Sequence, residues 1–476
     1  NVVLILASGR PIDLDLAGTD PGVLDYDGLV EIASRPEWSL LHDHAEDVLL
    51  QLGVRRPGGP AAECKTFKVH LRSGRVCLDL LHAEDARNPL WNGESNARNQ
   101  RLFDQGKWPL EYWVNECFDP GTAHEILIRS IDGVGSGSDE GERTAVGAKL
   151  YEGRMRGAPA VFFCKDSRVS GGATGDLEGR KYVAACYYAY MRDVPLYVWN
   201  DGAGANVRQG MVALNRAAEG FMMNALTAQG VDYARFLATV RSVGDPVLGR
   251  LFRELDETFG LSAPPNRARA ARNFMSVAVG VGSATGLDVY GSSQACIQVM
   301  LDSEQSYRVL TGSNVIRAVT GESLTNYEIG GARVMAHWTG TVDLVARDRV
   351  ELLRHVRRVH MLFSASRHRP LIARSREDVG GPEDGFADTV LNERRITLNV
   401  DHGSFVPFKS EYVEAAGLVG GFARLGGKHV LVMGPRTDAG VRSYASLVRT
   451  RDLLRIADKT RSPKILVVGG RWYRAV

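Results

Sequence analysis

The stretch "VPLYVWNDGAGANVRQGMVALNRAAEGF", residues 194–221, joins an apolar run to an amphipathic pattern through several small residues. The apolar run predicts a buried strand, and the pattern over 207–224 predicts a helix. The loop between them, 200–206, brings the amides of Ala203 and Gly204 to the start of that helix. Such donors suit an anion or a developing oxyanion. A tight strand-to-helix turn that binds no ligand is the alternative from this stretch alone.

The same alternation continues on both sides of the loop. Residues 146–166 predict two strands around a turn, and residues 177–193 predict a helix. Residues 273–292 repeat the order of apolar strand, small-residue loop and continuation, and Asp348 is expected to begin a helix. Strands that alternate with helices at this spacing predict layered βαβ-type units.

A second copy of the unit is visible near the end of the chain. Residues 419–434 echo 146–163, and residues 444–472 echo the helix, the strand and the start of the loop. An internal duplication is the economical explanation. The second copy stops where the first reaches its loop, so it has no counterpart of 207–335.

The composition limits the class of protein. A length of 476 residues predicts about three domains, or two large ones. A formal net charge of +2 gives no reason to expect nucleic acid or a membrane surface as a partner. The six cysteines form no CxxC pair, which argues against a zinc ribbon or a disulfide framework and favours a reducing, intracellular compartment. The sequence contains no run of about 18 apolar residues, so no transmembrane helix is predicted.

Residues 1–95 carry no chemistry that can be assigned from the sequence. The pattern over 29–54 predicts a helix, and the alternation over 64–81 predicts a hairpin. His42 and His44 could hold a metal ion, but no further ligands are spaced near them, so a solvated helix face is preferred and no metal site is predicted.

An arginine-rich segment lies further along the chain, at 363–378. It could meet phosphate groups, but a solvated inter-domain linker is the preferred interpretation.

Four ordered motifs resemble the carboxyltransferase family, the β subunits of biotin-dependent acyl-CoA carboxylases. They are "NECFDPGTAHEI" (115–126), "GGATGDLEGRKY" (171–182), "NDGAGANVRQG" (200–210) and the long block from "SYRVLTGSN" to "DLVARD" (306–348). The resemblance runs in order from about 96 to 476. It implies an α/β, duplicated crotonase-like (ββα) fold with the second copy truncated, plus an N-terminal extension.

The resemblance also implies a division into domains. The expected N-terminal extension covers 1–95, and the carboxyltransferase N-domain, on the acyl-CoA side, covers 96–362. A linker and the start of the second unit cover 363–418, and the truncated C-domain covers 419–476.

The same resemblance implies the residues of the site. The backbone amides of Ala203 and Gly204 are the expected catalytic oxyanion donors, because removal of a proton α to a thioester builds an enolate that fixed donors must stabilise. The implied substrate-binding residues are Gly171, Gly172, Gly202, Ser283, Ala284, Thr285 and Gly286. A coenzyme A thioester is the implied substrate, and biotin, carried on a partner domain, is the implied cofactor.

Two functions remain open at this stage. One is transfer of a carboxyl group from carboxybiotin to an acyl-CoA. The alternative is a catalytically inactive paralogue, kept as a structural subunit of a large assembly, mitochondrial or ribonucleoprotein in character. Asn206 and Thr285, which differ from the family motifs, favour the alternative. The family's second glycine–alanine loop lies beyond Val476, and its absence would also favour the alternative if Val476 is the true C-terminus. A homo- or hetero-oligomer with related carboxylase subunits is expected, in the mitochondrial matrix or the bacterial cytoplasm.

Overall fold

The computed structural model describes two compact units of the chain, residues 1–101 and 102–476. The residues that it describes are 2–6, 11–14, 48–53, 64–72, 75–80, 107–128, 131, 146–228, 238, 246–261, 275–364, 393–436 and 443–466. His42, His44 and residues 365–378 of the arginine-rich segment lie outside them. The expected domain boundaries at 95, 362 and 418 stay predictions.

The first unit contains a five-stranded antiparallel sheet in the order β2-β1-β3-β4-β5. Its strands are β1 (Val2–Leu6), β2 (Pro11–Leu14), β3 (Val48–Gly53), β4 (Cys64–Arg72) and β5 (Arg75–Leu80). The hairpin expected over 64–81 is confirmed by the pairing of β4 with β5. The helix expected over 29–54 is wrong at its end, where β3 pairs with both β1 and β4. A short apolar run such as "VLLQLG" has no period that separates a helix from a strand, so sheet pairing decides.

The second unit is built on an eight-stranded mixed sheet in which five neighbouring strands run parallel. Its order is β13-β11-β10-β9-β8-β7-β6, with β12 paired to β10. The strands are β6 (His124–Glu125), β7 (Ala148–Met155), β8 (Ala158–Lys165), β9 (Leu196–Gly202), β10 (Ser276–Thr285), β11 (Ile297–Leu301), β12 (Tyr307–Val309) and β13 (Leu344–Ala346).

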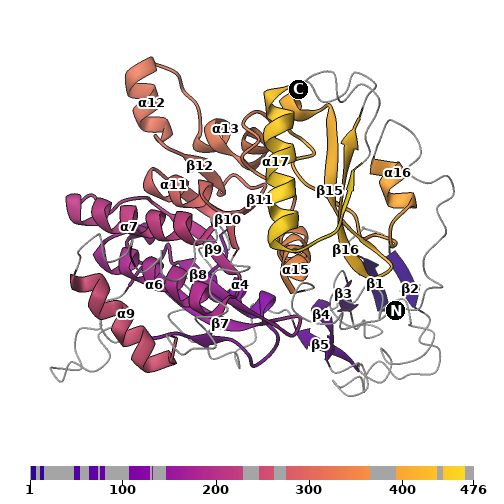
Figure 1. Ribbon diagram of the computed structural model, residues 1–476, viewed down its shortest axis with the longest axis horizontal. Helices are drawn as coiled ribbons and strands as arrows, with labels where there is room; N and C mark the ends of the chain where they lie inside the picture. The colour runs from indigo at the N-terminus through magenta and orange to yellow at the C-terminus, as the bar shows by residue number, and fades with distance from the viewer. Residues whose placement is uncertain are drawn as a thin grey trace, which may run out of the picture. The chain divides into compact units, whose positions relative to one another are not determined.

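Apolar side chains bury both faces of this sheet. Val161 and Phe163 of β8 belong to the core that includes α6 (Asp176–Arg192) and α9 (Pro246–Phe259), while Phe162 and Cys164 face the core with α4 (Leu110–Cys117). Side chains on a strand alternate between the two faces, so the continuous apolar run "AVFFC" is what a strand buried on both faces requires. The first repeat is therefore a layered sheet with helices on either side (Figure 1).

The remaining helices of the second unit follow the parallel strands. They are α7 (Met211–Ala228), α11 (Leu287–Ser293), α12 (Ser313–Thr320), α13 (Asn326–Gly330), α14 (Ala332–His337), α15 (Arg349–Ser364), α16 (Glu393–Leu398) and α17 (Tyr444–Lys459), with short 3₁₀ turns at Ser170–Gly172 and Val413–Ala415. The helix expected from Asp348 is confirmed by α15, whose first turn is capped because the Asp348 carboxylate accepts a hydrogen bond from the Glu351 amide at 2.8 Å.

Two expected boundaries are wrong. The helix expected from 207 begins at Met211, because residues 207–210 form a turn that ends at Gly210, which has a φ of +53°. The small-residue loop expected at 282–286, within 273–292, is largely strand, since β10 extends to Thr285 and Ser283, Ala284 and Thr285 pair with β12. The small side chains of these residues suggested an open loop, but their backbone groups are hydrogen-bonded in the sheet.

The expected duplication is confirmed by the smaller sheet, whose order is β14-β15-β16-β17. Its strands are β14 (Val406–Pro407), β15 (Leu418–Leu425), β16 (Lys428–Pro435) and β17 (Lys464–Leu466). In both repeats an antiparallel hairpin of two eight-residue strands is followed by a helix and then by a strand parallel to the hairpin's second strand. The Val161 amide donates to the Pro195 carbonyl at 3.0 Å, and the Leu431 amide donates to Pro463 at 2.8 Å, so the two repeats share their register.

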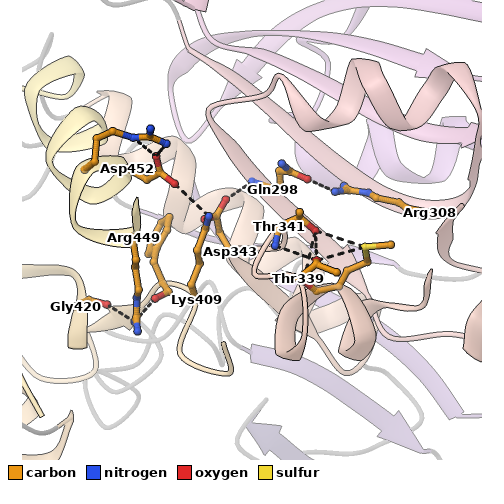
Figure 2. A network of polar contacts seen from close by, with 12 residues as sticks. Gln298, Arg308, Thr339, Thr341, Asp343, Lys409, Gly420, Arg449 and Asp452 are labelled. Atoms are coloured by element: carbon orange, nitrogen blue, oxygen red, sulfur yellow. Dashed lines mark hydrogen bonds and ion pairs between the residues drawn. The ribbon is translucent and has the colours of Figure 1, made fainter. Parts of the chain in front are cut away.

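A buried polar network joins residues of the two repeats (Figure 2). The Asp343 carboxylate accepts a hydrogen bond from the Gln298 amide at 2.7 Å and lies 3.7 Å from the Lys409 ammonium, which also pairs with Asp452 at 3.3 Å. Burial raises the pKa of Asp343, although Lys409 acts in the opposite direction. Since one apolar core includes residues of both sheets, the second repeat packs against the first within the second unit.

Candidate functional site

The candidate site lies at the carboxyl ends of the parallel strands β8, β9 and β10, where ligands bind in open α/β sheets. The loop that follows β9 is held there by its backbone. The Thr174 amide donates to the Gly204 carbonyl at 2.6 Å, and the Asn206 amide donates to the Thr174 carbonyl at 2.8 Å. The loop is thus pinned to the segment that leads into α6.

The two amides expected to serve as oxyanion donors are both bonded within the protein. The Ala203 amide donates to the Gly171 carbonyl at 3.0 Å, and the Gly204 amide donates to Oδ2 of Asp288 at 3.1 Å. A thioester oxygen can reach either amide only by replacing one of these acceptors. Their role toward a substrate therefore stays a prediction, and so does that of the expected substrate-binding residues.

The structure brings most of the expected residues together. Gly171 and Gly172 have φ values of +66° and +68°, and a Cβ on Gly172 would lie 2.3 Å from the Asp201 carbonyl oxygen. A Cβ on Gly202 would lie 2.4 Å from Oδ2 of Asp288. The glycines are needed because backbone passes directly over backbone at this point.

Residues 283–286 lie on the other side of the loop. A Cβ on Gly204 would lie 2.5 Å from the Thr285 carbonyl oxygen, so this loop and the end of β10 are in close contact. The Ser283 amide donates to the Asp201 carboxylate at 3.2 Å, Ala284 pairs with Gly202, and the Gly286 amide donates to Val309 at 2.8 Å. These hydrogen bonds close the site on the β10 side.

A buried ion pair that the sequence analysis missed lies beneath the loop. The Lys165 ammonium lies 2.9 Å from Oδ1 of Asp288, and the two side chains are only 5% and 7% exposed. Lys165 also donates to the Gly172 carbonyl at 3.0 Å and forms a short hydrogen bond with the Thr174 hydroxyl. One signal was available, because Lys165 directly ends the buried strand "AVFFC", where an unpaired cation would be costly.

A second ion pair holds the end of β9. The Asp201 carboxylate accepts a hydrogen bond from Lys107 at 2.9 Å in addition to the one from the Ser283 amide. A Cβ on Gly282 would lie 2.1 Å from Oδ1 of Asp201, so this carboxylate fills the space beside β10. Asp201 thereby connects the two strands whose ends form the site.

A small cavity of about 30 Å³ lies behind the loop, between β8, β9, α6 and α11. Its walls combine apolar side chains with Lys165, Asp288 and Glu178. Asn200, at the end of β9, also lines the cavity, and its buried Nδ2 has no hydrogen-bond partner. Among the described residues, no group of three or more His, Cys, Asp or Glu side chains could hold a metal ion, and no helix is long and apolar enough to cross a membrane.

A repeated hairpin–helix–strand unit with a glycine loop at the ends of its parallel strands defines an α/β protein of the crotonase-like class. The chain belongs to the carboxyl transferase domain family, whose model matches residues 140–244 and 260–470. The resemblance drawn from the motifs is thus confirmed.

Individual relatives are distant. The chain is 23% identical over 426 residues to the biotin-dependent acetyl-/propionyl-coenzyme A carboxylase beta5 subunit of Mycobacterium leprae, a match that covers 85% of this chain and 68% of that protein. It is 23% identical over 401 residues to the mitochondrial propionyl-CoA carboxylase beta chain of Homo sapiens, covering 81% of this chain and 66% of that one.

A solved structure supports the fold. The transcarboxylase 12S structure with methylmalonyl-coenzyme A bound matches with a TM-score of 0.60 and 20% identity, covering 78% of this chain and 65% of that chain. The chain thus spans about two thirds of the length of these relatives.

Proposed function

We propose that this chain is a carboxyltransferase subunit that moves a carboxyl group from carboxybiotin to the α-carbon of an acyl-CoA. The observation that carries the proposal is the glycine loop 202–204, packed against Gly171 and Thr285 at the carboxyl ends of parallel strands, in a chain of the carboxyl transferase family. Relatives that are named acetyl-/propionyl-CoA carboxylase subunits favour a coenzyme A thioester as the substrate.

The chemistry requires stabilisation of negative charge on the thioester oxygen. When bound, carboxybiotin would supply the carboxyl group for the new C–C bond at the α-carbon and, after loss of that group, a ring nitrogen as the base for the α-carbon proton. The backbone amides of Ala203 and Gly204 are the chain's donors for the enolate oxygen. To bind it, the Ala203 amide must release the Gly171 carbonyl, and the Gly204 amide must release the Asp288 carboxylate.

The second repeat is proposed to provide the residues that face biotin. The position equivalent to the loop after β9 follows β17, and it lies outside the described residues. The carriers of biotin and the other subunits are proposed to be separate chains, since relatives are named as β subunits and the transcarboxylase core is described as a hexamer. A mitochondrial or bacterial intracellular location is proposed on the same relatives.

A second candidate function is favoured by one observation. The Asp288 carboxylate sits on the Gly204 amide, where the oxygen of a substrate would bind. If this bond does not exchange, the chain is an inactive paralogue that serves as a structural subunit of a larger assembly.

An assay of carboxyl transfer separates the two candidates. The purified chain, together with a carboxylated biotin carrier, is incubated with labelled acetyl-CoA or propionyl-CoA, and acyl-CoA binding is measured in parallel by calorimetry. Label transfer supports the first proposal. Acyl-CoA binding without transfer in the presence of the carrier favours the inactive paralogue, and failure to bind any acyl-CoA contradicts the first proposal.

A further inference from the structure

The Asp288 carboxylate divides its two oxygens between different partners. Oδ1 holds the buried ion pair with Lys165 at 2.9 Å and accepts a hydrogen bond from the Thr174 hydroxyl at 3.1 Å. Oδ2 accepts the hydrogen bond from the Gly204 amide, also at 3.1 Å. The carboxylate can therefore release the Gly204 amide through Oδ2 and keep its ion pair through Oδ1.

A carboxylate on the Gly204 amide opposes the chemistry proposed for that amide. The enolate oxygen carries negative charge, and a second anion at the same buried donor repels it. Oδ2 of Asp288 has to leave before the amide can stabilise an enolate. A buried carboxylate oxygen that loses a donor needs another one, so the site requires a second donor within reach of Oδ2.

Asn200 supplies an unused donor on the required face of β9. It is 3% exposed, and its Nδ2 has no hydrogen-bond partner. Asn200 and Gly202 are two residues apart on one strand, so their Cβ positions share a face and lie about 6–7 Å apart, whereas Trp199 and Asp201 line a different pocket, beside α4. Oδ2 of Asp288 lies 2.4 Å from the Cβ position of Gly202. The amide of Asn200 and the carboxylate oxygen therefore lie over the same face, one behind the other along the strand.

The small cavity behind the loop connects the two groups. Asp288 and Asn200 both line it, and its volume of about 30 Å³ is room for one or two water-sized groups, not for an acyl chain. A carboxylate oxygen that turns from Gly204 toward Asn200 moves within a space of this size.

The wall of the cavity holds two further side chains that can accept hydrogen bonds, Glu178 and Tyr182. The Glu178 carboxylate is fixed, because its two oxygens accept from the Gly147 and Gly175 amides at 2.8 and 2.9 Å. Neither side chain occupies an amide that the substrate needs. A role of Asn200 in opening the site therefore has to depend on Asp288.

We propose that Asp288 is a gate on the oxyanion site and that Asn200 is the positioning residue that receives it. When a thioester oxygen reaches the Gly204 amide, Oδ2 of Asp288 exchanges that amide for Nδ2 of Asn200, while Oδ1 keeps Lys165 and Thr174. The exchange leaves neither amide without an acceptor and moves negative charge away from the enolate. The inference rests on the proposed function, since a bound acyl-CoA opens the gate.

Calorimetry with acetyl-CoA and with free coenzyme A, which has a thiol in place of the thioester, tests the gate on the purified chain. Asn200→Leu removes the receiving donor. It is expected to lower the affinity for acetyl-CoA about tenfold, the effect of one lost hydrogen bond to a charged group, and to leave the affinity for coenzyme A within about twofold. Asn215→Leu, the same change at an exposed position of α7, is the matched control and changes neither affinity.

A background without the gate shows whether Asn200 acts through Asp288. In the variant Lys165→Met/Asp288→Leu no carboxylate lies on the Gly204 amide, and no buried charge is left unpaired. Adding Asn200→Leu to this variant is expected to change the ratio of the two affinities by less than about twofold. A tenfold loss of acetyl-CoA affinity in this background overturns the gate, because Asn200 would then act without Asp288.

The outcomes separate the gate from the proposed function. If the wild-type chain binds acetyl-CoA and Asn200→Leu weakens both ligands equally, or neither, the gate alone is overturned. A wild-type chain that does not bind acetyl-CoA contradicts the proposed function and the gate with it. If Asn200→Leu does not fold, a crystal structure of the wild-type chain with acetyl-CoA decides. Oδ2 of Asp288 is expected within hydrogen-bond distance of Nδ2 of Asn200, and an Oδ2 that stays on the Gly204 amide overturns the gate.

Discussion

Asp401 holds the hairpin turn of the second repeat as Asp119 holds that of the first. The Asp119 carboxylate accepts hydrogen bonds from the Arg156 and Gly157 amides at 2.9 and 2.7 Å. The Asp401 carboxylate accepts from the amides of residues 426 and 427, both at 2.8 Å. Both turns have two consecutive residues with positive φ, the conformation of a type I′ hairpin turn.

The equivalence extends three residues beyond each aspartate. The Thr122 hydroxyl donates to the Asp119 carbonyl at 2.7 Å and accepts from the Arg154 amide at 3.1 Å. The Ser404 hydroxyl donates to the Asp401 carbonyl at 2.6 Å and accepts from the Arg424 amide at 3.0 Å. The duplication therefore begins before the hairpin, at the "DPGT" and "DHGS" segments, earlier than the strand echo alone indicates.

Removal of either aspartate is expected to destabilise the protein. Asp119→Ala and Asp401→Ala each remove two charge-assisted hydrogen bonds from turn amides, and each should lower the free energy of unfolding by about 1–3 kcal/mol. Urea unfolding measures the change. Glu322→Ala, which removes an exposed carboxylate, is the control and should cost less than about 0.5 kcal/mol. A change of that small size for Asp119 or Asp401 would contradict the role of the turn.

The buried pair of Lys165 and Asp288 is expected to behave as a unit. Asp288→Leu leaves an unpaired ammonium in the interior and should cost about 3–5 kcal/mol in urea unfolding. The double variant Lys165→Met/Asp288→Leu removes both charges and should cost at least 1 kcal/mol less than the sum of the single changes. Additive single costs would show that the two charges do not stabilise each other.

Much of the fold could be predicted because its signals are local and repeated. The apolar runs of β8 and β9 and the echo at 419–434 depend on periodicity and on self-similarity, which sheet packing confirms. The start of α7 and the end of β10 were missed for one reason. The turn that ends at Gly210 interrupts a pattern whose apolar period continues through it, and Ser283–Thr285 pair with a strand that follows later in the chain, so periodicity within each segment misplaces both boundaries.

The site was predicted less completely. The glycines that bring backbone close to backbone could be found, because small residues after a strand are a local signal. Asp288 could not be assigned to the Gly204 amide, because 84 residues separate the two along the chain and only the parallel pairing of β9 with β10 brings them together. Asn200 lines the cavity behind the loop together with residues of β8, α6 and α11, a neighbourhood that no sequence pattern marks.

Acidification is expected to destabilise the chain through two histidines. Burial lowers the pKa of His355 and of His429 to about 4 in the folded protein, and the neighbouring Arg424 acts in the same direction on His429. The unfolded state binds protons near pH 6.5, above these folded values, so stability is lost as the pH falls from about 6.5 to about 4.

Urea unfolding at a series of pH values measures this loss, which should be at least about 1 kcal/mol. His429→Leu is expected to flatten the pH dependence. His337→Leu removes an exposed imidazole, leaves both buried rings in place and should retain it. A wild-type free energy of unfolding that does not change between pH 6.5 and 4 would contradict the assignment.

Two glycines with positive φ, Gly204 and Gly210, separate the effect of the contact between the loop and β10 from the effect of backbone strain alone. Gly204 has a φ of +82°, and a Cβ there would lie 2.5 Å from the Thr285 carbonyl oxygen, whereas Gly210 has a φ of +53° and no atom within 4 Å of the same position. Both alanine variants pay about 1–2 kcal/mol for a left-handed residue, but only Gly204→Ala must also push the loop away from β10. We therefore expect Gly204→Ala to lower acyl-CoA affinity at least tenfold and Gly210→Ala to leave it within about threefold of the wild-type value. Calorimetry measures the acyl-CoA affinity of both variants, and a thermal transition confirms that each is folded. Equal losses of affinity in the two variants would show that backbone strain, not the contact between the loop and Thr285, governs binding.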